Sequence, residues 1–321
     1  MLTVADVGEA GLVARIQRYV RSAKDGVVVG VGDDAALVRA LAPAAVLTTD
    51  MLVENVDFAF AWAKWADVGH KAAAVNLSDL AAMGAEPRGL LLSLALRPTD
   101  GVRDVMALVA TLADVGNAYG APLVGGDLSK IDGPVVASVT AIGEVDPRKA
   151  LRRYGGCPGD IVLVSGSLGE GAAGLLALQR GIKSPLTKRQ LRPTPRVELG
   201  RSLAKADIIT SAADISDGLA RDALHVAAVG CGVAIDPEAL PIRPVTRALA
   251  KRLGHDVINL AVAGGEDFEL VLSVEPNDVL RAQRIASRHG VALTPIGTVT
   301  KRGGLKIGST RRSYRAFEHF R

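Results

Sequence analysis

Residues 66–96 read ADVGHKAAAVNLSDLAAMGAEPRGLLLSLAL, and the fold can be predicted from this stretch outward. In Ala66–Met83 the apolar residues recur at helical spacing and the pattern stops at Gly84, which predicts a helix. Gly89–Leu96 is a nearly unbroken apolar run closed by Pro98, which predicts a buried strand. A helix that leads directly into a buried strand is typical of an α/β fold.

The same alternation continues on both sides of this stretch. Further strands are predicted at Val46–Thr49, Val135–Ile142, Asp160–Val164, Gly232–Ile235, Phe268–Val274 and Leu293–Val299. Further helices are predicted at Gly101–Tyr119, Gly171–Arg180, Arg196–Ala206, Gly218–Val229 and Asp278–His289. Between two of these helices, Lys183–Pro195 has the composition of a basic, proline-bearing loop.

The length of 321 residues favours two domains of about 150 residues each. The stretch Gly143–Pro158 is charged, rich in turn residues and low in periodicity, so we place the boundary there. This predicts an N-terminal domain at 1–145 and a C-terminal α/β domain at 146–321. No repeat with a period of about 20 to 50 residues is present, which excludes solenoids and propellers.

Charge and cysteine content exclude several classes of protein. The 38 Lys and Arg residues against 34 Asp and Glu give a formal net charge of +4, and the basic residues are scattered, so nucleic acid is not an expected partner. Cys157 and Cys231 cannot form a disulfide framework or a cysteine-based zinc site. Asp6 and Glu9 lie where a secretory signal would be basic and then apolar, and no uncharged apolar run approaches the roughly 18–20 residues of a membrane span. We therefore expect a cytoplasmic protein without a membrane partner.

Acidic residues end several runs of apolar or small residues. These runs are GVGDDAA with Asp33 and Asp34, VLTTD with Asp50, AVNLSD with Asp79, PLVGGD with Asp127, TSAADISDG with Asp214 and Asp217, and AVAGGEDFEL with Glu266 and Asp267. Each acid by itself could cap a helix or form a turn. If the strand ends of an α/β sheet bring the acids together, however, they repel one another unless cations lie between them. Oxygen ligands without His or Cys suit Mg²⁺, which predicts a Mg²⁺-dependent site for a phosphorylated substrate.

Other kinds of site lack their sequence patterns. There is no G-x-x-x-x-G-K-[ST], H-E-x-x-H or G-x-S-x-G, and neither cysteine has a nearby base, so no covalent nucleophile is predicted. Ser165–Gly174, SGSLGEGAAG, follows a strand and opens a helix, but its glycine spacing favours a tight strand–helix turn over a dinucleotide loop. Arg148–Arg153 is the densest basic run, and one of its arginines could clamp a nucleotide phosphate.

Taken in order, GVGDDAALV, TTDMLVENVDF, KAAAVNLSDLAAMGAEP, GGDLSK, GGCPGD, LRPTPR, DISDGL and GGEDFEL resemble the thiamine-monophosphate kinase family. The resemblance extends from about Gly30 to Phe320. NLSDLAAMGA and GGD also occur in the wider superfamily of aminoimidazole ribonucleotide synthetase and selenophosphate synthetase. DISDGL, GGEDFEL and the terminal FEHF at Phe317–Phe320 are more particular to the kinases, although an Asp is common where this chain has Glu318.

The resemblance implies a two-domain fold of the aminoimidazole ribonucleotide synthetase type. The N-terminal domain would bind ATP and several Mg²⁺ ions and would pair its sheet across a homodimer. The implied reaction is direct transfer of the γ-phosphoryl group of ATP to thiamine phosphate, which gives thiamine diphosphate and ADP and is the last step of thiamine diphosphate biosynthesis. Catalysis would rest on alignment and charge neutralisation, in agreement with the missing nucleophile.

The resemblance also implies roles for individual residues. The implied metal ligands are Asp34, Thr48, Thr49, Asp50, Asp79, Asp127, Asp214 and Asp217. The implied ATP contacts are Gly126, Asp127, Arg153 and Ser216, and the implied thiamine contacts are Asp57, Glu266 and Phe317. Some relatives carry His where this chain has Asp57, so a carboxylate there would act through metal or water.

Two alternatives to the kinase remain at this point. One is another ATP-dependent synthetase of the same superfamily; against selenophosphate synthetase, the first cysteine here is Cys157 rather than a residue of a glycine-rich N-terminal segment. The other is a non-catalytic Mg-nucleotide-binding protein, against which the complete acidic set argues.

Overall fold

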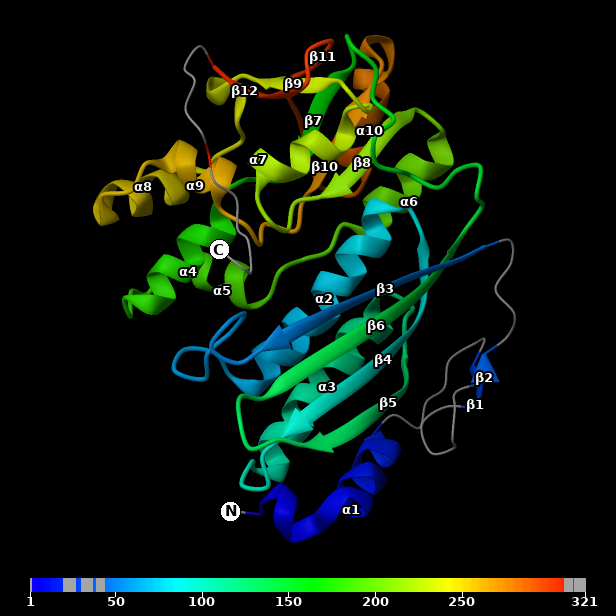
Figure 1. The fold of residues 1–321 in the computed structure, drawn as a ribbon, viewed down its shortest axis with the longest axis vertical. Helices are drawn as coiled ribbons and strands as arrows, with labels where there is room; N and C mark the ends of the chain where they lie inside the picture. Colours follow the sequence, from blue (N-terminus) through cyan, green and yellow to red (C-terminus); the bar gives the residue numbers. More distant parts are fainter. Residues whose placement is uncertain (1, 20–26, 30–36, 39–43, 309–313, 315–321) are drawn as a thin grey trace. The chain divides into compact units, whose positions relative to one another are not determined.

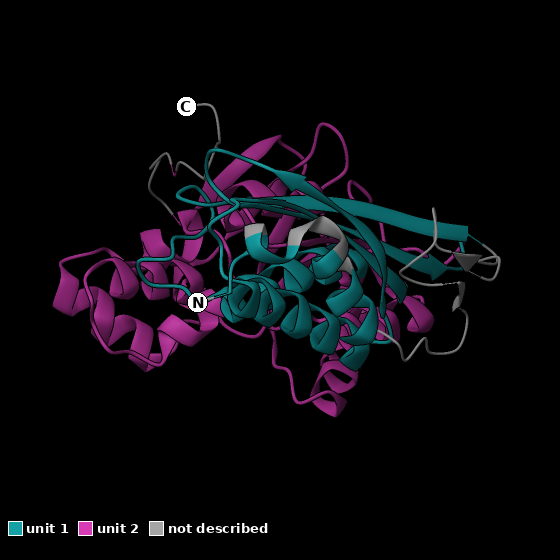
Figure 2. Ribbon diagram, turned by 90° about the horizontal axis from the view of Figure 1, so that it is seen from below, with its two compact units in different colours: residues 1–80, 86–147 teal, residues 81–85, 148–321 magenta. Residues whose placement is uncertain are grey.

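The computed structural model describes residues 2–19, 27–29, 37–38, 44–308 and 314. The chain divides into two compact units, which are coloured separately in Figure 2. Unit 1 contains Met1–Leu80 and Glu86–Pro147, and unit 2 contains Ala81–Ala85 and Arg148–Arg321. No helix in the described residues is both long and apolar enough to cross a membrane.

The described part of unit 1 is built on a four-stranded sheet with the strand order β3-β6-β4-β5. The strands are β3 (Ala44–Val53), β4 (Glu86–Leu96), β5 (Leu123–Lys130) and β6 (Val136–Val145). β6 is antiparallel to both β3 and β4, whereas β4 and β5 run parallel with a helix in the connection. A short antiparallel pair, β1 (Val27–Val29) and β2 (Leu37–Val38), precedes the sheet.

Helices cover one face of this sheet, as Figures 1 and 2 show. They are α1 (Val4–Tyr19), α2 (Trp65–Ala82) and α3 (Val102–Ala118). α2 and α3 are in backbone contact, because a Cβ on Gly69 would lie 2.1 Å from the carbonyl oxygen of Leu108. Alternate residues of β6 are buried beneath the helices while the residues between them are half-buried, which is the period of a sheet covered on one side.

The described part of unit 2 contains a six-stranded sheet with the order β12-β9-β11-β7-β10-β8. The strands are β7 (Ile161–Ser165), β8 (Ile209–Asp214), β9 (Gly232–Ile235), β10 (Leu270–Val274), β11 (Leu293–Thr300) and β12 (Gly304–Ile307). The pairs are antiparallel except β12 with β9.

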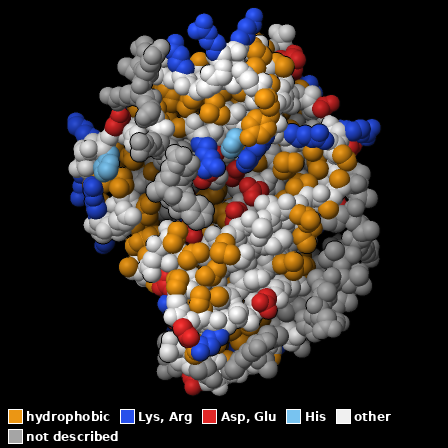
Figure 3. Space-filling view, in the orientation of Figure 1, with side chains coloured by type: hydrophobic (Ala, Val, Ile, Leu, Met, Phe, Trp, Pro, Cys, Tyr) orange, Lys and Arg blue, Asp and Glu red, His pale blue; other side chains and the backbone are white. Residues whose placement is uncertain are grey.

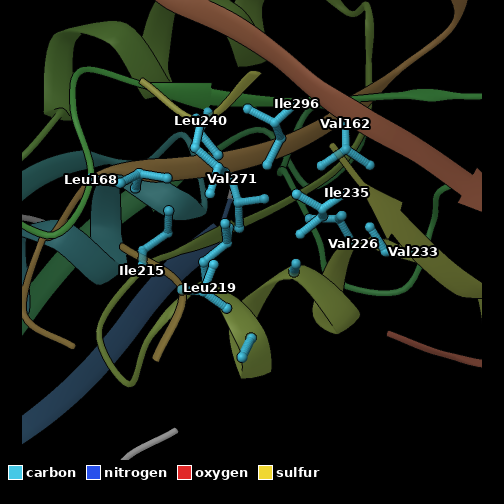
Figure 4. Close-up of a cluster of buried hydrophobic side chains, with 14 of the residues drawn as sticks. Val162, Leu168, Ile215, Leu219, Val226, Val233, Ile235, Leu240, Val271 and Ile296 are labelled. Carbon is cyan, nitrogen blue, oxygen red and sulfur yellow. The ribbon is translucent and has the colours of Figure 1, made fainter. Parts of the chain in front are cut away.

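Helices and a large apolar core complete unit 2. The helices are α4 (Glu170–Gln179), α5 (Leu186–Leu191), α6 (Val197–Ala206), α7 (Leu219–Asp222), α8 (Pro244–Leu253), α9 (Val257–Ala263) and α10 (Val279–Arg288), with 3-10 turns η1 (Ala223–Val226), η2 (Pro237–Ala239) and η3 (Pro276–Asp278). Ile215, inside the DISDG segment, and Leu219, directly after it, lie in the core with Val162, Leu168 and Val271 (Figure 4). Core packing therefore fixes both ends of that acidic segment.

Most predicted elements are confirmed. Ala66–Met83 corresponds to α2, Gly89–Leu96 falls within β4, and Gly232–Ile235 matches β9 residue for residue. The prediction that Lys183–Pro195 is a loop is wrong in part, because α5 occupies its centre.

Two further predictions need correction. The helix predicted at Gly218–Val229 is only the short α7 followed by the turn η1, after which the backbone becomes extended at Ala227. The sheets are also largely antiparallel, so the acids do not all follow strand ends. Asp50 and Asp127 lie inside β3 and β5, and of these strand acids only Asp214 ends its strand, β8.

Candidate functional site

In unit 1, strand β3 and helix α2 bring three of the predicted ligands to one face of the sheet. The Thr48 hydroxyl donates a hydrogen bond to the Asp79 carboxylate on α2. Asp50 lies two residues after Thr48 on β3 and therefore on the same face. Its backbone N–H donates to Oδ1 of Asn76 at 3.1 Å, and Asn76 lies one helical turn before Asp79.

Asn76 was not predicted from the sequence, but it orients this set. Its side chain is fully buried, and its Nδ2 donates to the carbonyl of Ala72 at 3.0 Å. With the nitrogen so fixed, Oδ1 faces the β3 backbone at Asp50. An Asn in the otherwise apolar face of a predicted helix is a signal that could have revealed it, since a buried amide needs partners.

The Thr49 side chain lies on the other face of β3. Its hydroxyl donates to the carbonyl of Val139 at 3.0 Å and accepts from the Thr140 hydroxyl at 3.2 Å. Because adjacent strand residues point to opposite faces, this hydroxyl is turned away from Thr48 and Asp50. Thr49 could therefore bind the Mg²⁺ ion predicted at Thr48 and Asp50 only through its backbone oxygen.

Asp127 is separated from Asp50 within unit 1. β5 and β3 form opposite edges of the sheet, about 14 Å apart at the usual strand spacing. The register pairs Asp127 with Ser93 and Ser93 with Ser138. Ser138 pairs in turn with Met51 rather than with Asp50. Asp127 therefore belongs to the uncovered face. The adjacent Gly126 admits no side chain, because a Cβ would lie 1.9 Å from the carbonyl oxygen of Leu92.

Asp57 closes the turn that follows β3. Its carboxylate accepts from the N–H of Val53 at 2.8 Å, and its carbonyl accepts from Nζ of the buried Lys71 at 3.0 Å. The side chain thus has a structural role in this turn, and its contact with a substrate stays a prediction.

In unit 2, the DISDG segment forms a tight turn between β8 and α7. Asp214 is 2 % exposed at the end of β8. The Asp217 carboxylate pairs with Nη1 of Arg221 at 2.8 Å. Gly218 has a φ of 118°, a conformation that L side chains rarely adopt, which explains the glycine in this position.

The buried carboxylate of Asp222, which was not predicted, holds this turn. It accepts hydrogen bonds from the N–H groups of Asp217 at 3.1 Å and Gly218 at 3.0 Å. Burial, and then the charge of Asp217, raise the pKa of Asp222 to about 7 against the opposing effect of the two N–H donors and, after them, of the charge of Arg153. An acid in the first turn of a helix was the available sequence signal.

Arg153 lies in the same neighbourhood as His225. Burial, followed by the charges of Arg153 and Arg221, lowers the pKa of His225 to about 4, so this imidazole is neutral at pH 7. The His225 ring makes an edge contact with Tyr154, the residue next to Arg153. Unit 2 therefore brings Arg153 close to the turn that carries Ser216 and Asp217.

The GGEDF segment lies beside the DISDG turn. The N–H of Glu266 donates to the carbonyl of Ser216 at 2.7 Å, and the N–H of Phe268 donates to that of Ile215 at 2.9 Å. A Cβ on Gly265 would lie 2.5 Å from the Ser216 oxygen, so the approach of the two segments requires a glycine. The sequence-predicted Ser216, Asp217 and Glu266 are thereby brought together.

Two buried glutamates bind three arginines around this segment. Glu269 is 0 % exposed and accepts from the Ser165 hydroxyl at 2.6 Å, from Arg189 at 3.1 Å and from Nε of Arg196 at 2.6 Å. Glu170 accepts from Arg189 at 3.1 Å and from Arg243 at 2.8 Å. None of these residues was predicted to be part of the site, although Arg196 belongs to the LRPTPR motif.

Among the residues that the structure describes, no group of three or more His, Cys, Asp or Glu side chains is arranged to hold a metal ion unaided. The pair of carboxylates at Asp50 and Asp79 with the Thr48 hydroxyl still fits Mg²⁺ chemically. Magnesium is usually bound through one or two protein carboxylates together with substrate phosphates and water. Asp34 and Phe317 lie outside the described residues.

Comparison with known proteins identifies the family. Residues 32–145 match the family described as AIR synthase related protein, N-terminal domain, and residues 157–309 match AIR synthase related protein, C-terminal domain. The thiamine-monophosphate kinase of Escherichia coli K12 is 38% identical over 304 residues, which cover 91% of this chain and 90% of the relative. This chain belongs to the thiamine-monophosphate kinase family.

Solved structures of the family have the same fold. The thiamine-monophosphate kinase of Stenotrophomonas maltophilia K279a superimposes with a TM-score of 0.85 and 34% identity, covering 95% of this chain and 98% of the other. AaThiL, solved in complex with AMPPCP and TMP, gives a TM-score of 0.79 and 30% identity, covering 100% and 99%. The resemblance inferred from the sequence motifs is confirmed at the level of family and fold.

The acid that follows Glu266 in the family's GGEDFEL motif anchors helix α4. Asp267 accepts from the N–H of Gly169 at 2.7 Å and from that of Gly171 at 2.9 Å, at the start of α4. The loop Ser165–Gly174 is therefore a tight strand–helix turn, as predicted, and its amides bind a carboxylate of the chain itself.

The titration of Asp267 should make stability depend on pH. Burial raises the pKa of Asp267 from 3.8 to about 7 against the opposing effect of its two N–H donors. The folded state then holds a proton that the unfolded state has released, so the stabilisation is complete below about pH 4 and is lost as the pH rises toward 7. We expect the wild type to lose stability relative to the Asp267→Asn variant as the pH rises over this range. Urea unfolding at several pH values measures it; parallel curves for the two proteins would contradict the assignment.

Proposed function

We propose that this chain transfers the γ-phosphoryl group of ATP to thiamine phosphate with the help of Mg²⁺, which gives thiamine diphosphate and ADP. The observation that carries the proposal is the pairing of Thr48 with Asp79 beside Asp50, in the motifs that mark the kinase family. Identity of 38% over nine tenths of the chain to a named thiamine-monophosphate kinase supports the same reaction, as does the AaThiL complex with AMPPCP and TMP.

The donor atoms define where Mg²⁺ would bind. In unit 1 these are the carboxylates of Asp50 and Asp79 with oxygens of Thr48 and Thr49, and we assign Asp34 and Asp127 to the same role. In unit 2 they are the carboxylates of Asp214 and Asp217. When bound, Mg²⁺ neutralises and aligns the phosphate oxygens, so that charge developing in transfer is stabilised.

The remaining residues bind and orient the two substrates. We assign the Arg153 guanidinium to the phosphates of ATP, because its planar donors match phosphate oxygens, and Gly126 and Ser216 to the same substrate. Glu266 and Phe317 would hold the thiamine moiety, since a carboxylate and an aromatic ring both attract a cationic thiazolium. We also assign Asp57 to that substrate, through metal or water. The attacking atom is already a phosphate oxygen and needs little help from a base, so positioning accounts for most of the catalysis.

The uncovered face of the unit 1 sheet is the surface that we propose for a homodimer. Leu47 and Met51 on β3 are 69% and 58% exposed. Figure 3, in which this face of the sheet is turned toward the reader, shows further hydrophobic side chains over it, with some acidic side chains between them. Exposed apolar surface on one face of a sheet is typical of an interface between proteins. Light scattering, which gives the mass in solution, tests the pairing.

We also infer a cytoplasmic location, where ATP is available.

A coupled assay of ADP release tests the reaction. Purified protein with ATP and Mg²⁺ is expected to release ADP when thiamine phosphate is present, and not with thiamine or without an acceptor. ATP turnover that is indifferent to thiamine phosphate would reject the kinase and favour another reaction of the superfamily. Binding of ATP without any turnover would favour a nucleotide-binding protein.

A further inference from the structure

The carboxylate of Glu266 is held by a fixed backbone. Glu266 has a φ of 66° and Phe268 a φ of 49°, both in the left-handed region that residues with a Cβ seldom adopt. The hydrogen bonds of these two residues to Ser216 and Ile215 keep the segment in this conformation. Strained backbone of this kind is characteristic of functional sites, where the surrounding structure maintains it.

Helix α5 supplies a second polar group at the same place. The amide of Gln190 donates from Nε2 to Oε2 of Glu266. An ionised carboxylate can only accept, so the amide group that faces it is the NH₂ and the carbonyl oxygen points elsewhere. This chemistry settles the orientation of the amide, which geometry alone leaves open to a flip.

In the part of the chain that the structure describes, the carbonyl end of Gln190 has no partner. Gln190 is 2 % exposed, and its Oε1 is enclosed without a hydrogen bond. Buried side-chain acceptors are nearly always paired in folded proteins, so one that is not requires an explanation. Here the unpaired oxygen belongs to the same amide that binds Glu266, the residue assigned to the thiamine moiety.

Gln190 is also held firmly against this segment. Its neighbour Arg189 binds Glu170 and Glu269 at 3.1 Å each, and Glu269 is on the same chain segment as Glu266. On the other side, a Cβ on Gly174 would lie 2.9 Å from Cβ of Gln190, so α4 and α5 are in close contact there. The ion pairs and the packing keep the amide beside the Glu266 carboxylate.

We propose that Gln190 and Glu266 together recognise the exocyclic amine of the aminopyrimidine ring of thiamine phosphate, with Oε1 of Gln190 accepting one N–H and the Glu266 carboxylate accepting the other. This rests on the proposed kinase function and names the part of the substrate that unit 2 selects. An aromatic amine presents two coplanar N–H donors. Glu266 and Gln190 supply the two acceptors, and Oε1 of Gln190, which is enclosed in the structure, must become accessible when the substrate binds. A site built to accept such hydrogen bonds rejects analogues that lack the donors, because its own buried acceptors are then left unpaired.

The experiment compares thiamine phosphate with oxythiamine phosphate, in which an oxygen replaces this amine. We expect the wild type to prefer thiamine phosphate by about 100-fold or more in kcat/KM. In Gln190→Met, which has nearly the same shape without polar atoms, KM for thiamine phosphate should rise about tenfold. Turnover of oxythiamine phosphate should change little, and KM for ATP and the midpoint of thermal unfolding should stay as in the wild type.

Gln283→Met is the matched control. Gln283 lies on α10 in the same unit and donates to the carbonyl of Leu293 at 2.9 Å, a contact that does not involve the GGEDF segment. It should leave the preference between the two substrates unchanged. If Gln190→Met does not fold, Gln190→Glu, of equal size, replaces the donor to Glu266 with a third carboxylate oxygen and should reduce the preference as well.

The outcomes separate this proposal from the kinase itself. If the wild type does not turn over thiamine phosphate, the proposed function fails. If the wild type is active but variants at Gln190 keep the full preference, or lose activity equally toward both substrates, recognition of the amine by Gln190 is overturned. A loss confined to the substrate that carries the amine supports it.

Discussion

Replacing Asp50 by Asn is expected to lower kcat for ADP formation by about 1,000-fold while thermal unfolding is nearly unchanged. The substitution keeps the size of the side chain and removes the charge that would hold Mg²⁺ at the phosphates. The loss of one group that stabilises developing charge typically lowers the rate by roughly 100- to 1,000-fold. The fold should tolerate it because Asp50 is bonded to Asn76 through its backbone N–H, which Asn retains. Steady-state kinetics at saturating Mg²⁺, with calorimetry of the same samples, measures both.

The control for Asp50 is another Asp→Asn change in unit 1. The Asp132 side chain is 83% exposed and pairs with Lys130, whose side chain is 66% exposed, so Asp132→Asn should leave kcat and stability as they are. If Asp50→Asn remained active and lost about 1 kcal/mol of stability instead, Asp50 would have a structural role such as a cap.

Replacing Glu269 by Ala is expected to give the largest loss of stability, about 3–5 kcal/mol. Glu269 is completely buried and accepts hydrogen bonds from Arg189, Arg196 and the Ser165 hydroxyl. Its removal leaves arginine charge in the interior without its carboxylate, which costs far more than the pair contributes as a whole. Urea unfolding at pH 7 measures the change in free energy.

Glu198→Ala is the comparison for Glu269. Glu198 also pairs with an arginine, Arg201, at 3.2 Å, but its side chain is 56% exposed. Exposed pairs of this kind contribute about 0–1 kcal/mol, so the variant should unfold close to the wild type. Equal effects of the two substitutions would show that burial does not control the strength of these ion pairs.

Local sequence pattern was sufficient for the elements whose burial is regular. α2 and β4 were predictable because helical spacing ends at a glycine and a continuous apolar run follows. β5 was not, since LVGGDLSK contains two glycines and an acid and has the composition of a turn. Its strand conformation comes from pairing with β4, and Gly126 is required there by the close approach of Leu92.

The candidate site could be predicted in its acids and not in the groups that position them. Asp50, Asp79 and Asp217 stand out because they follow apolar runs. Asn76, Asp222 and Gln190 acquire their roles from partners far away in the sequence or across a turn, which no periodicity reveals. The antiparallel order of the strands, set by tertiary pairing, also moved Asp50 and Asp127 from the expected strand ends into strand interiors.

The alternation along β3 limits how this part of the gene can evolve. Thr48 and Asp50 point toward the helices, whereas Leu47, Thr49 and Met51 point away from them. An insertion or deletion of one codon within β3 would exchange the two sets, turning the acidic oxygens outward and the apolar side chains inward. Substitutions at the outward positions, in contrast, can alter one surface without touching the other. Protein engineers who change positions 47 and 51 alter the face proposed for the homodimer and leave the acidic face in place, provided that the number of residues in β3 stays constant.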